Sequence, residues 1–183
     1  RPWQDQGTFT SVFRDAVDTA ALRADLMEHV QRQHEHLLTT NLDNDDGLAS
    51  DFCERLTEQN RHGIRCAMYW PSGLIRSGAS LYLRTDRRNA FCSVLEPWSA
   101  PVTAWSEYHN EFPKIMPAVE VDGPPGWLQV VHGTNVSNRV RGRLVSPDSY
   151  LGRFGNTLQG IRVPSHAEVR RDRVVGYPIR SAR

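Results

Sequence analysis

Hydrophobic residues near the start of the chain recur with the period of an α-helix. Apolar side chains at four-residue spacing between positions 22 and 30 predict a helix that begins at Asp18 or Thr19, either of which can cap its amino end. The more polar residues that follow indicate an end near Gln33. Residues 1–17 show no clear period, and we expect a loop or a short element there.

A short apolar run, an acidic turn and a second helical pattern come next. Residues 36–42 are mostly apolar or small, which suits a buried parallel strand. Apolar residues then recur on one face of the segment 48–60, which predicts a second helix. The succession of helix, strand, turn and helix is typical of an α/β unit, so the predicted fold class is α/β.

In the middle of the chain the hydrophobic pattern becomes typical of β-strands. We interpret this region as a strand-rich insertion beyond the α/β unit, with strands predicted over 64–70, 74–76, 80–84 and 89–95. Residues 103–112 predict another helix, and a proline–glycine turn precedes a predicted strand over 127–132. The last part, 145–183, is rich in arginine and interrupted by glycine and proline, and we expect it to form a tail.

Composition narrows the class of protein. The 183 residues are 39% hydrophobic and 23% charged with a net charge of +1, which fits one domain over 1–183 and predicts no nucleic-acid partner. No apolar run approaches the ~20 residues that span a bilayer, and the first residues do not form a secretory signal. The three cysteines are widely spaced, which indicates reduced thiols and predicts a cytoplasmic location.

The acidic turn is the feature with the most chemical content. Asp43, Asp45 and Asp46 would repel one another unless a cation lay among them, and hard oxygen ligands suit Mg²⁺ or Mn²⁺ completed by phosphates and water. A calcium loop of the EF-hand type is excluded because Gly47 offers no ligand and Leu48 stands where such a loop needs glycine. A solvated turn that only caps the next helix stays open, and a phosphatase-type or nuclease-type site would need more partners than the sequence places.

Three blocks of sequence resemble a known family. Residues 37–49 resemble the Asp-x-Asp segment of the bacterial Putative rhamnosyl transferase family, which is one of the GT-A type glycosyltransferases. Residues 89–96 and 125–138, with Arg141-Gly142 after them, are similar to two further blocks of that family in the same order. The resemblance spans roughly residues 20–145 and implies a GT-A-like (Rossmann-like) mixed sheet with flanking helices. It implies a metal-dependent transferase that moves a sugar from a nucleotide-sugar donor to an unknown glycan or other acceptor.

The position of the acidic turn departs from the pattern of the family. In GT-A enzymes the Asp-x-Asp segment ends the first nucleotide-binding half, whereas here it begins at residue 43. We therefore expect the strands that hold the base and the ribose to be largely missing from this chain. The chain would then be an amino-terminally truncated member of the family. The alternative to a transferase is a non-catalytic carbohydrate-binding or interaction module derived from a transferase fragment.

The resemblance also implies roles for individual residues. It places Asp43 near the ribose and the metal, Asp45 as a direct metal ligand and Asp46 as a ligand or orienting group. His132 corresponds to a late histidine that GT-A enzymes often supply to the same metal, Mn²⁺ or Mg²⁺. The chemistry requires a cation because charge develops on the nucleoside diphosphate as the sugar departs.

Other polar residues are candidates for substrate binding and proton transfer. Asn135, Asn138 and Arg141 could donate hydrogen bonds to the diphosphate or the sugar. Glu96 is the candidate general base, because it lies at the end of a predicted strand where it could face a cleft. Alternative bases and sugar-stacking aromatic residues lie just beyond it, namely Glu107, His109 and Glu111 for the base, and Trp98, Trp105 and Tyr108 for stacking.

Other residues suggest two further functions. His132-Gly133-Thr134 resembles the motif of ADP-ribosyltransferase folds, but Tyr150 and Glu168 are poorly spaced for that site and the acidic turn is left unexplained. The arginine-rich tail could contact nucleic acid or, as a peripheral membrane contact, acidic lipid. No aromatic-flanked groove or known module accompanies it, which argues against nucleic acid.

Overall fold

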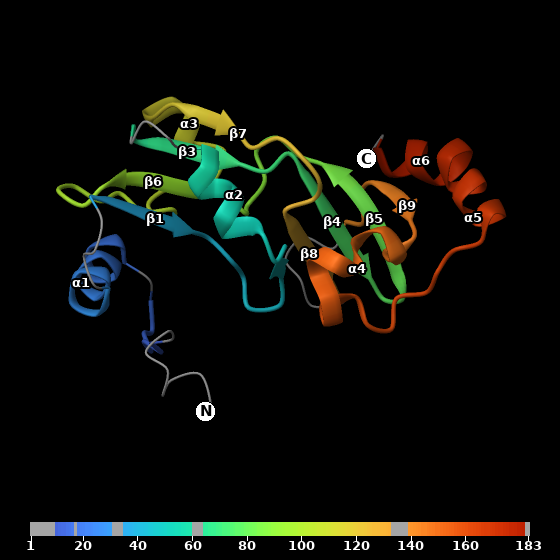
Figure 1. Ribbon diagram of the computed structural model, residues 1–183, viewed down its shortest axis with the longest axis horizontal. Helices are drawn as coiled ribbons and strands as arrows, with labels where there is room; N and C mark the ends of the chain where they lie inside the picture. Colours follow the sequence, from blue (N-terminus) through green and yellow to red (C-terminus); the bar gives the residue numbers. More distant parts are fainter. Residues whose placement is uncertain (1–9, 17, 31–34, 60–63, 133–138, 182–183) are drawn as a thin grey trace.

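Two β-sheets form the body of the protein (Figure 1), which is described by a computed structural model over residues 10–16, 18–30, 35–59, 64–132 and 139–181. The first sheet has the strand order β1-β6-β3-β7. Its strands are β1 (His36–Thr40), β6 (Ser93–Pro97), β3 (Cys66–Tyr69) and β7 (Ala118–Glu120). The second sheet has the order β2-β8-β4-β5-β9. Its strands are β2 (Gly47–Leu48), β8 (Trp127–Val131), β4 (Ser72–Ser77), β5 (Ser80–Thr85) and β9 (Arg143–Val145).

The α/β class agrees with the prediction, but the sheet arrangement differs from it. The predicted single mixed sheet is two sheets, and the only parallel pairs among the described strands are β3 with β7 and β4 with β8. The predicted insertion over residues 64–95 is not separate, because its strands are built into both sheets. The Rossmann-like order that the resemblance implies is not evident in these pairings.

Strand β1 also differs from its prediction. It is an edge strand that pairs antiparallel with β6, and Leu37 is its one buried residue, so the expectation of a buried parallel strand was wrong. Its other side chains, among them Thr39 and Thr40, are only partly buried. These polar residues suit an edge, where one side of the strand meets solvent.

Strand β3 passes through Trp70 and Pro71 into β4 and so joins the two sheets. The indole nitrogen of Trp127 donates a hydrogen bond to the Trp70 carbonyl oxygen at 2.8 Å, and both rings belong to the main core cluster. Gly73 permits this packing, because a Cβ atom there would lie 2.0 Å from the Trp127 ring. The tryptophan pair therefore ties the sheets to one another through a close approach that a larger residue at position 73 would prevent.

The amino-terminal helices begin where local chemistry favours them. Helix α1 (Thr19–His29) is capped by Asp18, whose side chain accepts the backbone N–H of Ala20 and Ala21, as predicted. It ends at His29 rather than near Gln33, because Val30 adopts an extended backbone. Helix α2 (Phe52–Gln59) begins four residues later than predicted, since Gly47 and Leu48 pair with β8 as β2.

The segment 103–112 is not the helix that its pattern predicts. Its residues form turns and bends, Thr103 has a φ of +71°, and only the short helix α3 (Phe112–Ile115) follows. A positive φ at a β-branched residue is incompatible with a continuing α-helix. The segment instead packs Ala104 and Phe112 against the face of the first sheet opposite to the main core.

The carboxyl-terminal region, predicted as an arginine-rich tail, forms a series of short helices. Phe154 and Leu158 pack on Leu74, Leu81 and Leu128 of the second sheet. A further helical stretch, which follows this layer, ends at the described carboxyl end of the chain (Figure 1). No described helix has the length and apolar character needed to cross a bilayer. The elements are η2 (Pro147–Tyr150), α4 (Leu151–Phe154), η3 (Gly155–Leu158), α5 (His166–Arg171), the π-helix η4 (Asp172–Gly176) and α6 (Tyr177–Ser181).

Candidate functional site

The acidic turn connects the two sheets next to the end of β8. It leaves β1 at Asn41, and the backbone N–H of Asp46 donates to the carbonyl oxygen of Asp43 at 3.2 Å. The chain then forms β2, in which Gly47 lies opposite Leu128. This antiparallel register places the turn beside the residues that end β8.

Asp45 and His132 are in direct contact across the site. The Nε2 atom of His132 lies 2.7 Å from Oδ2 of Asp45, although the residues are 87 positions apart in the chain. Both side chains are partly open to solvent, at 46% exposure for His132 and 31% for Asp45, so a ligand can reach them. Two residues that the sequence analysis proposed as ligands of one metal therefore lie together.

Asp46 attaches the turn to β8. Its Oδ1 atom accepts the backbone N–H of Val130 at 2.8 Å. Burial raises the pKa of this carboxyl to about 6, and the charges of Asp45 and Asp43 raise it further, whereas the Val130 hydrogen bond and His132 lower it. The carboxyl group thus lies where a negative charge is unfavourable unless a positive group approaches.

Within the residues that the structure describes, no group of three or more His, Cys, Asp or Glu side chains is arranged to hold a metal ion. The Asp45–His132 pair can offer one oxygen and one nitrogen. Mg²⁺ and Mn²⁺ are commonly held by one or two protein groups together with substrate phosphates and water. The donor set therefore fits such an ion only as part of a complex with a phosphorylated substrate.

Glu96 is not at the mouth of a cleft, and the expectation that it faces one was wrong. It lies within β6, is 0% exposed, and its two oxygens accept the backbone N–H groups of Val102 and Thr103 at 2.6 and 2.7 Å. Arg65 approaches one of these oxygens at 3.6 Å. These contacts describe a carboxylate that holds a neighbouring loop, and they leave it little capacity to accept a substrate proton.

The loop that Glu96 holds forms one wall of a cavity of about 500 Å³. Asn41, which follows β1, also lines this cavity and leads directly into the acidic turn. Four of the residues predicted as alternative bases or stacking groups line this cavity, and so does Cys92, which no pattern in the sequence indicated. The cavity is lined by Asn41, Cys92, Ala104, Trp105, Ser106, Glu107, Tyr108 and His109.

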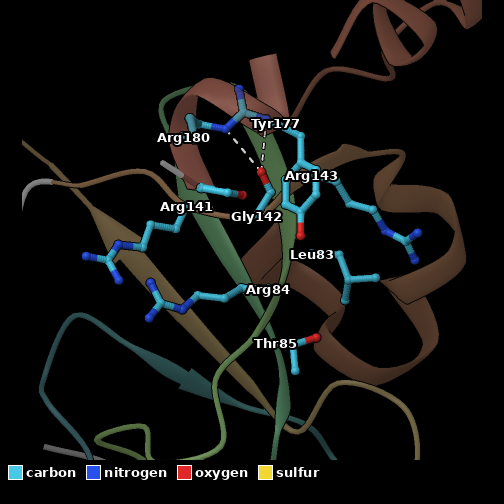
Figure 2. A pocket seen from close by; sticks show the side chains of 9 residues that line it. Leu83, Arg84, Thr85, Arg141, Gly142, Arg143, Tyr177 and Arg180 are labelled. Atoms are coloured by element: carbon cyan, nitrogen blue, oxygen red, sulfur yellow. Dashed lines mark hydrogen bonds between the residues drawn. The ribbon is translucent and has the colours of Figure 1, made fainter. Parts of the chain in front are cut away.

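The other proposed substrate-binding residues are not gathered at the turn. Asn135 and Asn138 lie outside the described residues. Arg141 lines a different cavity, together with Arg84 and Arg180 (Figure 2). No periodicity in the sequence indicates that Arg84 and Arg180 meet there, because their proximity depends on strand register and on the fold of the last helices.

Comparison with known proteins bears on the resemblance found in the sequence. The model of the Putative rhamnosyl transferase family matches residues 3–144, well over half of the chain. Neither a curated protein nor a solved structure gives a match. The predicted resemblance is confirmed by this match, and the chain belongs to the Putative rhamnosyl transferase family.

Proposed function

We propose that this protein is a metal-dependent glycosyltransferase that moves a sugar from a nucleotide-sugar donor to an acceptor. Membership of the Putative rhamnosyl transferase family supports the transfer of a sugar. The single observation that carries the metal-dependent site is the 2.7 Å contact between Asp45 and His132. It unites a carboxylate and an imidazole, two ligand types that Mn²⁺ accepts, beside a turn with two more carboxyl groups.

In this proposal Asp45 and His132 hold Mn²⁺ or Mg²⁺, and Asp46 fixes the turn through its hydrogen bond to the Val130 N–H. Asp43 lies in the same turn, where its carbonyl oxygen accepts the Asp46 N–H, and its carboxyl is proposed to approach the ribose and the metal. When bound, the cation supplies Lewis-acid stabilisation of the nucleoside diphosphate that leaves. It would also relieve the repulsion among the three carboxyl groups, which otherwise contributes to the raised pKa of Asp46.

We propose that the cavity beyond Asn41 receives the sugar or the acceptor. Trp105 and Tyr108 line it and are 47% and 80% exposed, so their rings can stack on the apolar face of a sugar. His109 lines the same cavity, and burial lowers the pKa of its imidazole, which favours the neutral form that can accept a proton. His109 therefore replaces Glu96 as the proposed base, because both Glu96 oxygens already accept backbone hydrogen bonds.

The test is donor hydrolysis by the whole protein in the presence of Mn²⁺. Replacement of Asp45 by alanine removes one of the two proposed ligands, and we expect the metal-dependent rate to fall by at least about 100-fold. Asp122→Ala is the matched control, because Asp122 is exposed and its side chain forms no hydrogen bond or ion pair with a described residue. An unchanged rate in Asp45→Ala with an intact fold would remove Asp45 from the mechanism. Sugar binding that persists without metal and without hydrolysis would instead favour a non-catalytic module.

A further inference from the structure

A second cavity, of about 470 Å³, lies between strands β5 and β9 and helix α6 (Figure 2). Every charged residue that lines it is an arginine, and three hydroxyl groups accompany them. The lining residues are Leu83, Arg84, Thr85, Arg141, Gly142, Arg143, Tyr177, Arg180 and Ser181. A cavity with four guanidinium groups and no carboxylate in its wall is electrostatically prepared for an anion.

Two of these arginines are neutralised by carboxylates that lie outside the cavity wall. Arg180 forms an ion pair with Asp172 and donates to the Gly142 carbonyl oxygen at 2.9 and 3.1 Å. Arg84 forms an ion pair with Asp86. These contacts fix the two guanidinium groups while leaving N–H donors available, because a guanidinium has five.

The other two arginines give the cavity its excess charge. Neither Arg141 nor Arg143 forms an ion pair with any residue in the described part of the chain. In Figure 2 the guanidinium groups of Arg84 and Arg141 extend to the same side of the cavity, whereas Arg143 points to the other side. Like charges that converge in this way are stabilised when an anion lies between them.

The backbone between the two unpaired arginines is closely constrained. Gly142 has a φ of +91°, and a Cβ atom there would lie 2.4 Å from the carbonyl oxygen of Leu83. Glycine therefore allows the chain to lie against β5 and to place Arg141 beside Arg84. The placement of Arg141 therefore depends on the backbone conformation at Gly142.

The cavity is distinct from the acidic turn. Arg84 lies opposite Gly73 at the start of β4, whereas the residue before His132, Val131, lies opposite Ser77 at the end of β4. The two sites are also at different edges of the sheet, because the turn leads into β2 and the cavity adjoins β9. A ligand bound here would not be the diphosphate held at Asp45 and His132.

We propose that this cavity binds the phosphate or diphosphate group of a phosphorylated ligand, with Arg84 and Arg141 as the principal contacts. The planar guanidinium fork of each arginine matches the oxygens of a phosphate. Arg84 is opposed by Asp86 and Arg141 by no carboxylate of the described residues, so these two contacts carry an excess positive charge that favours an anion. The phosphate can belong to a soluble molecule or to a lipid headgroup.

Calorimetric titration of the whole protein with sodium pyrophosphate in EDTA tests the proposal, since the chelator prevents a metal-mediated contribution from the acidic turn. We expect saturable binding that weakens at least 10-fold in Arg141→Gln and in Arg84→Gln. Arg141→Gln is the more decisive variant, because it removes no ion pair of the described structure. Arg170→Gln makes the same change of charge at an exposed residue of α5 and should bind like the wild type. Asp45→Asn should also bind normally, which separates this site from the proposed donor site.

Vesicles distinguish the two sources of phosphate. Co-sedimentation with phosphatidylcholine vesicles is compared with and without phosphatidic acid, for the wild type, Arg141→Gln and Arg170→Gln. If the wild type and Arg170→Gln bind the vesicles that contain phosphatidic acid and Arg141→Gln does not, the site is assigned to a lipid headgroup. If the protein binds pyrophosphate but not these vesicles, the site is assigned to a soluble ligand. The proposal is overturned if neither probe binds saturably, or if Arg170→Gln loses as much binding as Arg141→Gln.

Discussion

Asp46 connects the fold to the candidate site at the scale of a single residue. Its carboxyl accepts the Val130 N–H, and burial raises its pKa from the ordinary value of 3.8 to about 6. The folded protein therefore holds a proton on this group at pH values where the unfolded chain has released it. Between pH 4 and 6 the free energy of unfolding should consequently fall as the pH rises.

Replacement of Asp46 by asparagine should remove this pH-dependent loss of stability, because the amide oxygen can still accept the Val130 N–H and the amide carries no charge. At pH 7 and without divalent metal, we expect Asp46→Asn to exceed the wild type in free energy of unfolding by about 1–2 kcal/mol, after allowance for partial exposure. Urea titrations from pH 4 to pH 7 measure the difference, which should close at pH 4. A constant difference across this range would show that the Asp46 carboxyl ionises normally.

The candidate residues could be predicted from the sequence to different degrees. The sequence blocks that contain Asp45 and His132 resemble one family, which predicts a shared site, and the structure places the two side chains in contact. The burial of Glu96 could not be predicted, because its position beside Pro97 says nothing about the loop whose N–H groups it accepts. Burial of a charged group depends on tertiary contacts between distant segments, and no local pattern reports it.

At the scale of secondary-structure elements, Glu96 joins strand β6 to the loop that follows it. Its oxygens accept the Val102 and Thr103 N–H groups, and Thr103 has the unfavourable φ of +71°. A buried carboxylate with two charge-assisted hydrogen bonds can hold a backbone that would otherwise relax.

Replacement of Glu96 by alanine should lower the free energy of unfolding by about 2–4 kcal/mol, since one buried and one partly buried N–H donor lose their acceptor. Urea denaturation measures this loss. Glu107→Ala is the control, because Glu107 lies on the same loop and is exposed, so it should change stability by less than about 0.5 kcal/mol. A Glu96→Ala protein that is as stable as the wild type but inactive would restore Glu96 as the base.

The positions of several helices and strands could be predicted because local chemistry determines where they begin and end. The Asp18 cap of α1 and the strands β3, β4 and β5 lie close to their predicted positions. The predicted helix over 103–112 failed although its aromatic residues are spaced like a helical face, because Glu96 holds the backbone at Thr103 and because Ala104 and Phe112 pack against the first sheet. Tertiary contacts overrode the periodic signal there.

At the scale of the whole molecule, the division into two sheets could not be predicted from hydrophobic patterns. Alternation marks a strand but does not choose its partner, and β4 takes β8, which lies about fifty positions further along the chain, as a parallel neighbour. On its other side β8 pairs with β2, and this second pairing brings His132 to the acidic turn. The register of β5 and β9 likewise creates the arginine-lined cavity at the other end of the sheet.

The central claim is that Asp45 and His132 bind a metal together with the diphosphate of a sugar donor. A thermal-shift screen of nucleotide sugars, with and without Mn²⁺, tests it most directly, because a ligand that binds the folded state raises the melting temperature by mass action. We predict that at least one nucleotide sugar raises the melting temperature only when Mn²⁺ is present, and that Asp45→Asn and His132→Gln each abolish the shift. A shift that persists in both variants, or no Mn²⁺-dependent shift with any donor, would contradict the account.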